Sequence, residues 1–453
     1  MALRFDLAAT TSAALNAPRS GRLVLDRAPL EAAQDRPATA PPIVLETPNF
    51  FKYTRRGLQP HLVREVAAEV GSLPDATRVQ IEDFLESDFP DCGKYSGGLH
   101  RFIALDRSDM LLLDTLDPVV ATRAAKSTNK YMGIDSEGGI RRLTPETFAQ
   151  LVSTLRPDIY IPLADYIEEP LPSLTQGKRI AKSVDRSTRW LDECLERITF
   201  PAAVFAPVMG SHSPELRDKC AQSLAARNNI DGYAFNDVCL SLPFEQKLAL
   251  AQRSLGHLDA SKPRYMLGVS SPDHVVRAIL GGIDLFDSSY PYAVTEQGFA
   301  STYLLNGQAG SSPRSVSDSG HLDLWQESMF GDFEPLVKGC ECFTCRNHHR
   351  SYIHHLLMTK EMLATVLLQI HNMHWYQRFF ADVRCSMASG TLESDAARFL
   401  ECYGCLSSQP ATAPSLKRAF NELDKLASQT CSPTTKIQRK RYGELPAAPT
   451  NAA

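Results

Sequence analysis

Residues 263–287 read PRYMLGVSSPDHVVRAILGGIDLFD, and the order of elements that they predict indicates the fold class. It opens with a short apolar run, Arg264–Val269, and closes with a second one, Ile283–Phe286. Between them, Ser271-Pro272-Asp273 is typical of a helix start, because a serine side chain caps the first turn and proline suits its first position. Two short buried strands joined by a helix predict a parallel βα unit.

The same alternation runs upstream of this stretch. We expect strands at Ala203–Val208 and Gly232–Phe235, each followed by a helix, at Glu215–Arg227 and Pro243–Leu258 respectively. Repeated βα units favour a (β/α)₈ barrel or a doubly wound sheet. No Gly-x-Gly-x-x-Gly turn follows any of these strands, which argues against a dinucleotide-binding sheet.

A barrel would place its working face just past the carboxyl ends of its strands. In this sequence those positions are Met209-Gly210, Asn236-Asp237 and Asp287-Ser288.

The first 26 residues allow two interpretations. Leu3–Leu7 and Gly21–Asp26 alternate apolar and polar residues like the strands of a hairpin. The Ala-rich start, which carries arginines and few acids, also resembles a mitochondrial transit peptide. We favour the hairpin, and we expect the Ala- and Pro-rich segment Pro29–Pro42 to form a loop between strand-like stretches.

Composition limits the function classes. The chain has 453 residues, 43% hydrophobic and 22% charged, which is typical of globular domains and excludes wholesale disorder. Its 48 Lys and Arg against 52 Asp and Glu exclude a uniformly basic surface but leave room for a local basic patch. Apolar runs such as Met362–Ile370 are too short to span a bilayer. Eleven cysteines, an odd number with no signal peptide before them, indicate reduced thiols and a cytoplasmic protein.

Three cysteines lie within six residues, at Cys340, Cys342 and Cys345. Such closely spaced thiolates can point at one tetrahedral zinc ion, with a histidine as fourth ligand, and a site with all four positions filled is structural. The alternative is a loop of reduced cysteines. The candidate histidines are His348, His349, His354, His355, His371 and His374.

The C-terminal part of the chain is predicted to be helical. We expect a long helix at Met358–Phe380 and a second at Leu416–Ser428. The lone pair Cys402 and Cys405 is interpreted as free thiols at a turn. The basic segment Lys436–Tyr442, around Arg439, is interpreted as a solvated terminus, with contact to RNA phosphates or nuclear import as alternatives.

Cys340, Cys342 and Cys345, followed by His371 after 25 intervening residues, resemble the zinc site of the tRNA-guanine transglycosylases. The resemblance extends over residues 3–385, through Pro263–Val269, Gly282–Asp287, Arg186–Leu191, Leu143–Glu146 and Ser96–Gly98.

This resemblance implies an α/β fold: a (β/α)₈ TIM-type barrel with an N-terminal β-hairpin region and a C-terminal zinc-binding helical subdomain. We expect barrel and N-terminal strands in residues 1–335, the zinc subdomain and helices in 336–430, and a tail in 431–453. One Zn²⁺ per chain would be held by Cys340, Cys342, Cys345 and His371.

Members of this family exchange guanine in tRNA for queuine or its precursor. The resemblance puts Asp287 at the position of their carboxylate nucleophile. Their acid/base aspartate corresponds to Tyr95, and their pocket glutamine to Met209. The pocket Gly-Gly-Leu corresponds to Asn236-Asp237-Val238, and two RNA-holding arginines correspond to Ala293 and Glu296.

A pocket carboxylate is retained if Asp165 takes its place, although an ungapped alignment puts Ala164 there. Groups of one catalytic unit act together, so losing several leaves Asp287 with a structural role and a barrel without its own chemistry. No catalytic residue is therefore expected.

A chain that keeps zinc and fold but loses the pocket resembles the non-catalytic accessory chains of the eukaryotic enzymes. The resemblance implies a heterodimer with a catalytic queuine tRNA-ribosyltransferase subunit, in which this chain helps to hold tRNA. The complex would act on position 34 of tRNAs with GUN anticodons to make queuosine. Family accessory chains are also placed at the outer face of mitochondria, and the zinc subdomain lies at the family's dimer face.

Two other hypotheses remain. One is a self-sufficient transglycosylase that uses Asp287. The other is a zinc-stabilised binding or scaffold protein that no longer acts on tRNA, which a net charge of −4 mildly favours.

Overall fold

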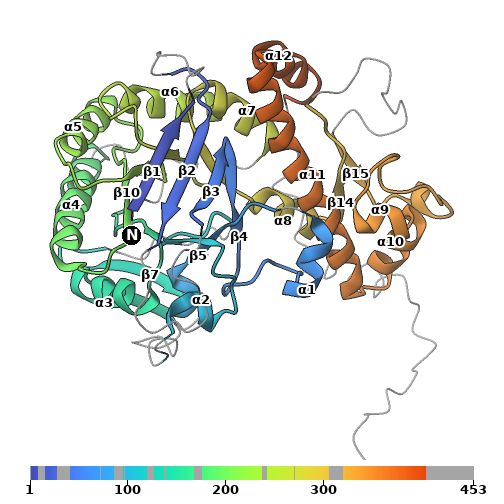
Figure 1. The fold of residues 1–453 in the computed structure, drawn as a ribbon, viewed down its shortest axis with the longest axis horizontal. Coiled ribbons are helices and arrows are strands. Elements are labelled where there is room, and N and C mark those ends of the chain that lie inside the picture. The colour runs from blue at the N-terminus through green and yellow to red at the C-terminus, as the bar shows by residue number, and fades with distance from the viewer. Residues whose placement is uncertain are drawn as a thin grey trace, which may run out of the picture. The chain divides into compact units, whose positions relative to one another are not determined.

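Eight parallel strands close into a barrel in the computed structural model of the chain (Figure 1). Asn49 lies opposite Leu285, which joins the N-terminal half of the barrel to its last strand. The (β/α)₈ prediction is therefore confirmed. Around the barrel the order is β10 (Ala203–Pro207), β11 (Gly232–Ala234), β12 (Arg264–Tyr265), β13 (Leu285–Asp287), β4 (Asn49–Tyr53), β5 (Ala76–Gln80), β6 (Met110–Asp114) and β9 (Ile159–Tyr160).

The structure describes residues 2–8, 16–27, 41–71, 73–85, 95, 97–119, 127–136, 139–167, 176–236, 242–269, 271–305 and 320–404. In this part of the chain, no helix is both long enough and apolar enough to cross a membrane.

Helices follow the barrel strands and surround them, as Figure 1 shows for α3 to α7. Two of these helices, α3 and α5, begin with side-chain caps: the hydroxyls of Thr144 and Ser213 each accept a backbone N–H three residues on, and a proline follows each. The helices are α1 (Arg64–Ala67), α2 (Gly98–Phe102), α3 (Pro145–Leu155), α4 (Gln176–Arg197), α5 (Pro214–Ala225), α6 (Phe244–Leu255), α7 (Pro272–Leu280) and α8 (Ser289–Glu296).

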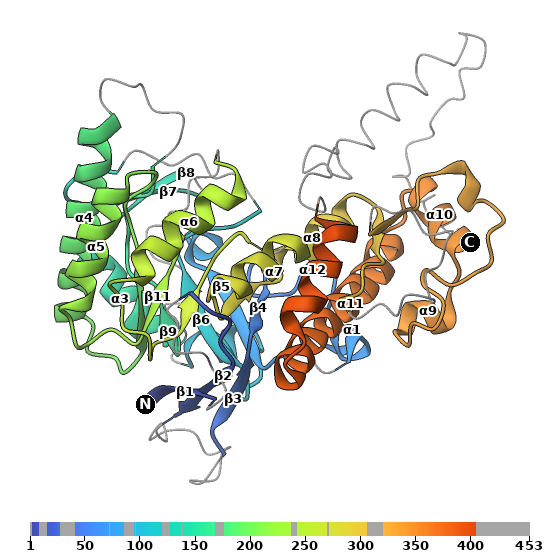
Figure 2. The same ribbon diagram turned by 90° about the horizontal axis from the view of Figure 1, so that it is seen from above.

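Three antiparallel strands at the N-terminus form a separate sheet of β1 (Ala2–Leu7), β2 (Gly21–Asp26) and β3 (Ile43–Thr47). Leu23, Leu25, Ile43 and Leu45 pack in one buried cluster with the first residues of four barrel strands, Ala76, Met110, Ile159 and Ala203. The sheet thus covers the N-terminal end of the barrel (Figure 2). The predicted hairpin is confirmed, with β3 as an additional strand.

The C-terminal region adds a strand pair, β14 (Phe299–Ser301) with β15 (His321–Asp323), and four helices: α9 (Phe343–Asn347), α10 (Arg350–Met358), α11 (Met362–Ser389) and α12 (Leu392–Tyr403). The long helix predicted at 358–380 was placed too early. Lys360 adopts a left-handed φ of 61°, which separates α10 from α11, and α11 continues to Gly390, whose φ of 71° ends it.

Three predicted features lie outside the described residues: the helix at 416–428, the basic segment 436–442 and Cys405. The same holds for the predicted loop at 29–42, apart from its last two residues. The boundary predicted between residues 335 and 336 stays a prediction.

Candidate functional site

A buried cluster of three thiols and one imidazole joins two distant parts of the chain. Cys340 and Cys342 precede α9, Cys345 lies within it, and His371 lies in α11. The Sγ atoms lie 3.8, 3.5 and 3.4 Å from Nδ1 of His371, in chain order. All four ligand atoms lie within 4.8 Å of one another and could hold a metal ion.

Local structure fixes the orientation of these ligands. The Sγ of Cys342 accepts the N–H of Cys345 and so caps α9. Nε2 of His371 donates to the carbonyl of Ser301 at 2.9 Å, which leaves Nδ1 facing the thiols. Asn372 donates to the carbonyl of Phe299 at 3.0 Å and so ties α11 to β14. Three cysteines and one histidine are a donor set typical of a structural zinc site.

The other candidate histidines have different contacts. His348 stacks on Tyr352, and His355 is exposed. His349 caps α10, while His354 and His374 donate to the carbonyls of Leu324 and Val70. Of the six candidates, only His371 joins the three cysteines.

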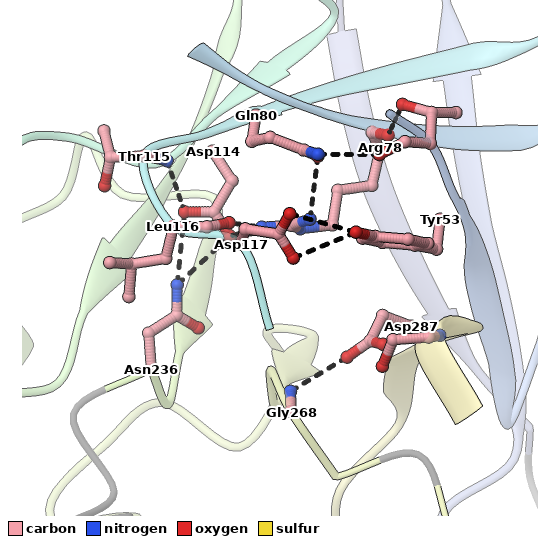
Figure 3. A network of polar contacts seen from close by, with 12 residues as sticks. Tyr53, Arg78, Gln80, Asp114, Thr115, Leu116, Asp117, Asn236, Gly268 and Asp287 are labelled. Atoms are coloured by element: carbon pink, nitrogen blue, oxygen red, sulfur yellow. Dashed lines mark hydrogen bonds and ion pairs between the residues drawn. The ribbon is translucent and has the colours of Figure 1, made fainter. Parts of the chain in front are cut away.

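The second site is the C-terminal end of the barrel, where Asp287 ends β13. Its side chain is fully buried, and its carboxylate accepts the backbone N–H groups of Gly268 and Ser289, each at 2.8 Å. Figure 3 shows it directed at Gly268. Backbone donors thus satisfy one lone pair on each oxygen of this carboxylate.

An ion pair occupies the same end of the barrel. Arg78 of β5 is fully buried, lies 3.3 Å from the carboxylate of Asp114 and also donates to Gln80 and to the carbonyl of Leu116. Asn236, which follows β11, donates to Asp114 at 3.2 Å (Figure 3). Burial raises the pKa of Asp114, and the neighbouring Arg78 opposes that rise.

Further polar contacts extend this network. The hydroxyl of Tyr53 donates to Asp117 at 3.0 Å, and its backbone N–H donates to the hydroxyl of Ser288 at 2.8 Å. Burial raises the pKa of Glu82 to about 8, with a smaller contribution from the charge of Asp117. Side chains at this end of the barrel therefore bind one another.

The remaining positions singled out from the sequence are dispersed. Tyr95 is 43% exposed and packs against the ring of Phe102, while Met209 is buried. Glu296 pairs with His61 at 2.8 Å, and Ala293 is half-buried on α8. Asp237 and Val238 lie outside the described residues.

Asp165 follows β9 and is fully buried. Its carboxylate forms ion pairs with Arg179 at 2.7 Å and Arg186 at 2.6 Å, both on α4. The sequence did not indicate that these two arginines pair with Asp165, although Arg186 lies in a segment that resembles the family, and it did not indicate the Arg78–Asp114 pair. Asp114 could have been found, since MLLLD at 110–114 is an apolar strand that ends in an acid, whereas nothing in ATRVQ at 76–80 marks Arg78.

Comparisons with known proteins agree with this architecture. The family model described as queuine tRNA-ribosyltransferase matches residues 34–404. The protein named queuine tRNA-ribosyltransferase accessory subunit 2 of Xenopus tropicalis is 31% identical over 386 residues, covering 77% of this chain and 91% of its own. The proteins of that name from Xenopus laevis and Homo sapiens are 32% and 31% identical over 383 residues, with the same coverage.

Proposed function

The chain belongs to the queuine tRNA-ribosyltransferase family, and on that basis we propose that it is the non-catalytic accessory subunit of the complex that exchanges guanine for queuine at position 34 of tRNAs with GUN anticodons. The observation that carries this proposal is the state of Asp287. Its carboxylate is engaged by Gly268 and Ser289, while Tyr95 takes the place of the acid/base carboxylate.

The reaction needs more than a nucleophile. Guanine leaves as a carboxylate attacks the ribose, and a second group must move the proton of the departing and entering bases. The exposed Tyr95 packs on Phe102 and offers only a phenol of high intrinsic pKa. The side chain of Asn236 reaches Asp114 where catalytic members have glycine. These contacts support a barrel that does not perform the exchange itself.

The metal is proposed to be one Zn²⁺ per chain, bound by Cys340, Cys342, Cys345 and His371. Four protein ligands fill a tetrahedral shell, so its role would be to stabilise the fold and not to activate water. The ion would clamp α9 against α11, because Cys345 lies on α9 and His371 lies on α11.

The partner is proposed to be a catalytic queuine tRNA-ribosyltransferase subunit, bound through the zinc-binding region. Phe330 and Phe333 are 79% and 74% exposed there, beside the start of α10. Large exposed aromatic side chains are typical of interface anchors. Replacing both by Asp should abolish heterodimer formation in size-exclusion chromatography. Ile140→Asp should not, because Ile140 is 67% exposed in a different place, the hairpin of β7 (Met132–Ser136) and β8 (Gly139–Leu143). If the double variant still forms the heterodimer, Phe330 and Phe333 are not part of the interface with the catalytic subunit.

The direct test of the function is incorporation of labelled guanine into a tRNA with guanosine at position 34. The purified chain is assayed alone, and then mixed with a catalytic subunit from the same source. We expect exchange only in the mixture, at a rate above that of the catalytic subunit alone. Exchange by this chain alone would contradict the proposal and would assign Asp287 a catalytic role.

A further inference from the structure

Five exposed cations gather on α4 and on the neighbouring hairpin of β7 (Met132–Ser136) and β8 (Gly139–Leu143). We call this the α4–β7 basic surface, and its residues are Lys130, Arg142, Lys178, Lys182 and Arg189. Lys178, Lys182 and Arg189 are spaced four and seven residues apart, which puts them along one face of the helix. They and the two hairpin residues come from segments more than thirty residues apart in the chain.

Hydrogen bonds hold the two parts of this surface together. Arg189 donates to the carbonyl of Asn129 at 2.6 Å, and Arg186 donates to the side chain of Asn129 at 3.0 Å. Lys130 is therefore anchored beside α4. Arg142 lies over the ring of Tyr131, 5.2 Å from its centroid, at the base of the hairpin. Figure 2 shows β7 and β8 next to α4.

Positive charge is concentrated here in a chain that is acidic overall. Residues 127–143 together with the whole of α4 contain nine cations and six carboxylates, whereas the whole chain has 48 and 52. The excess lies in the first part of α4, where residues 176–189 hold five cations and one carboxylate, and Glu193 farther along pairs with Arg189 at 3.6 Å. Lys130, Lys178 and Lys182 are exposed, and no carboxylate in the described part of the chain pairs with them. Asp185, which lies on the same face of α4, is neutralised by Lys219 of α5 at 2.9 Å.

Helix stability does not account for this arrangement. The N-terminus of a helix carries a partial positive charge and favours acidic residues, yet the first turn of α4 has none. Lys178 lies in the first turn, where its charge opposes the partial positive charge of the helix end, and Lys182 lies in the second turn. A negatively charged partner bound there would be attracted both by these lysines and by the positive end of the helix.

The surface borders the working end of the barrel. Asp165 lies just beyond the carboxyl end of β9, and its ion pairs with Arg179 and Arg186 hold the first half of α4 at that end. Asp287 ends β13, and Asn236 follows β11, at the same end of the barrel. A polyanion lying over the barrel mouth would therefore reach these lysines.

We propose that the α4–β7 basic surface binds the phosphate backbone of the tRNA on which the complex acts. This inference rests on the proposed function and adds to it the place where this subunit holds RNA. An RNA backbone fits better than an anionic membrane, because a membrane-binding face needs several apolar side chains to insert. On the described residues of this surface's two segments, Ile140 is the one large apolar side chain that is strongly exposed.

The test uses the complex of the full chain with the catalytic subunit. Lys130, Lys178 and Lys182 are replaced by Gln in a triple variant, which removes three charges without breaking a described ion pair. The control replaces Arg4, Arg22 and Arg64 by Gln. Arg4 and Arg22 lie on the sheet that covers the other end of the barrel, and Arg64 pairs with Asp106, just before β6. Binding of fluorescent tRNA is measured by anisotropy across a series of salt concentrations.

We expect the Lys130/Lys178/Lys182 variant to bind tRNA about tenfold more weakly, with a salt dependence shallower by about two to three counterions, since each phosphate contact contributes close to one. The control should change the Kd by less than about twofold. A complex whose tRNA affinity and salt slope survive the triple change would overturn the inference and leave the proposed function standing. A wild-type chain that forms no complex with the catalytic subunit would overturn both.

Binding to vesicles of phosphatidylserine and phosphatidylcholine is measured in parallel. Loss of vesicle binding in the triple variant, with tRNA binding intact, would replace RNA by a membrane as the partner of this surface.

Discussion

Oδ2 of Asp287 accepts the backbone N–H of Gly268 at 2.8 Å, which joins the end of β13 to the turn after β12. Gly268 has a φ of 71°, a conformation that suits glycine and directs its N–H at the carboxylate. An acid that would serve as a nucleophile in a related active site is here a connection between two strands. Under the proposed non-catalytic role, this contact gives the aspartate a structural function at its position.

Replacing Asp287 by Asn tests this interpretation. The variant should lose about 1–3 kcal/mol of unfolding free energy, because an amide nitrogen cannot accept the second backbone N–H and leaves it unsatisfied. Guanine exchange by the heterodimer should stay within about twofold of wild type. Urea unfolding and labelled-guanine incorporation measure the two effects. A fall in exchange by orders of magnitude, in a complex that still forms, would show that Asp287 takes part in catalysis.

The buried cluster of Cys340, Cys342, Cys345 and His371 makes a second prediction. Cys342→Ser and His371→Gln should each release the metal and destabilise the region of α9 and α11, since a filled structural site contributes directly to folding. Metal content by atomic emission and proteolysis of the folded chain report the two outcomes. Cys385→Ser is the matched control, because this exposed cysteine lies on the same helix as His371 and outside the cluster. Unchanged metal content in Cys342→Ser would show that Cys342 is not a metal ligand.

The sequence predicted the second half of the barrel well because its signals are local. In the stretch 263–287, Ser271-Pro272 marks the start of the helix, and Gly281-Gly282 mark its end and the approach to the second strand. The strand before Ser271 is only two residues long, Arg264–Tyr265, because pairing with the neighbouring strands and not apolar character sets its length. Spacing also pointed to the three clustered cysteines but left six histidines open. The family resemblance selected His371, and the structure brings His371 together with the cysteines.

The polar network at the barrel mouth could not be predicted in this way. Arg78 and Asp114 are 36 residues apart, and Asn236 is a further 122 residues away. Their contact depends on strand order and register in a closed barrel. A buried arginine has no sequence pattern of its own, because the partner that allows its burial comes from another strand. For the same reason the sequence suggests Asp165 as a pocket carboxylate and does not identify it as the partner of Arg179 and Arg186.

The ion pairs of Asp165 predict an ordered series of stabilities. Asp165→Asn should cost about 3–5 kcal/mol, because it removes the one buried carboxylate that balances two arginines. Arg179→Gln should cost less, because the side chain of Arg179 is 31% exposed and water already screens its charge. Thermal unfolding of both variants gives the comparison. Equal losses in the two would mean that the arginines do not share Asp165 in solution.

Glu82 makes the stability of the protein depend on pH. Its folded pKa is about 8, above the model-compound value of 4.5, since burial disfavours the charged carboxylate. Between these two values the folded chain keeps a proton that the unfolded chain releases. Stability is therefore lost as pH rises through this window, by up to about 1.4 kcal/mol per unit. Glu82→Gln should remove this loss. The unfolding free energy of the variant should therefore rise relative to that of wild type from pH 6 to 8, and the difference should change little above pH 8.

Urea unfolding at pH 6, 7, 8 and 9 measures this difference. Glu327→Gln, at an exposed site, is the control, because it carries the same change of side chain and experiences the same pH dependence of metal binding. The difference between the Glu82 variant and this control isolates the buried carboxyl. A constant difference from pH 6 to 9 would show that Glu82 is ionised throughout, and that Arg78 outweighs both burial and the neighbouring acids in setting its charge.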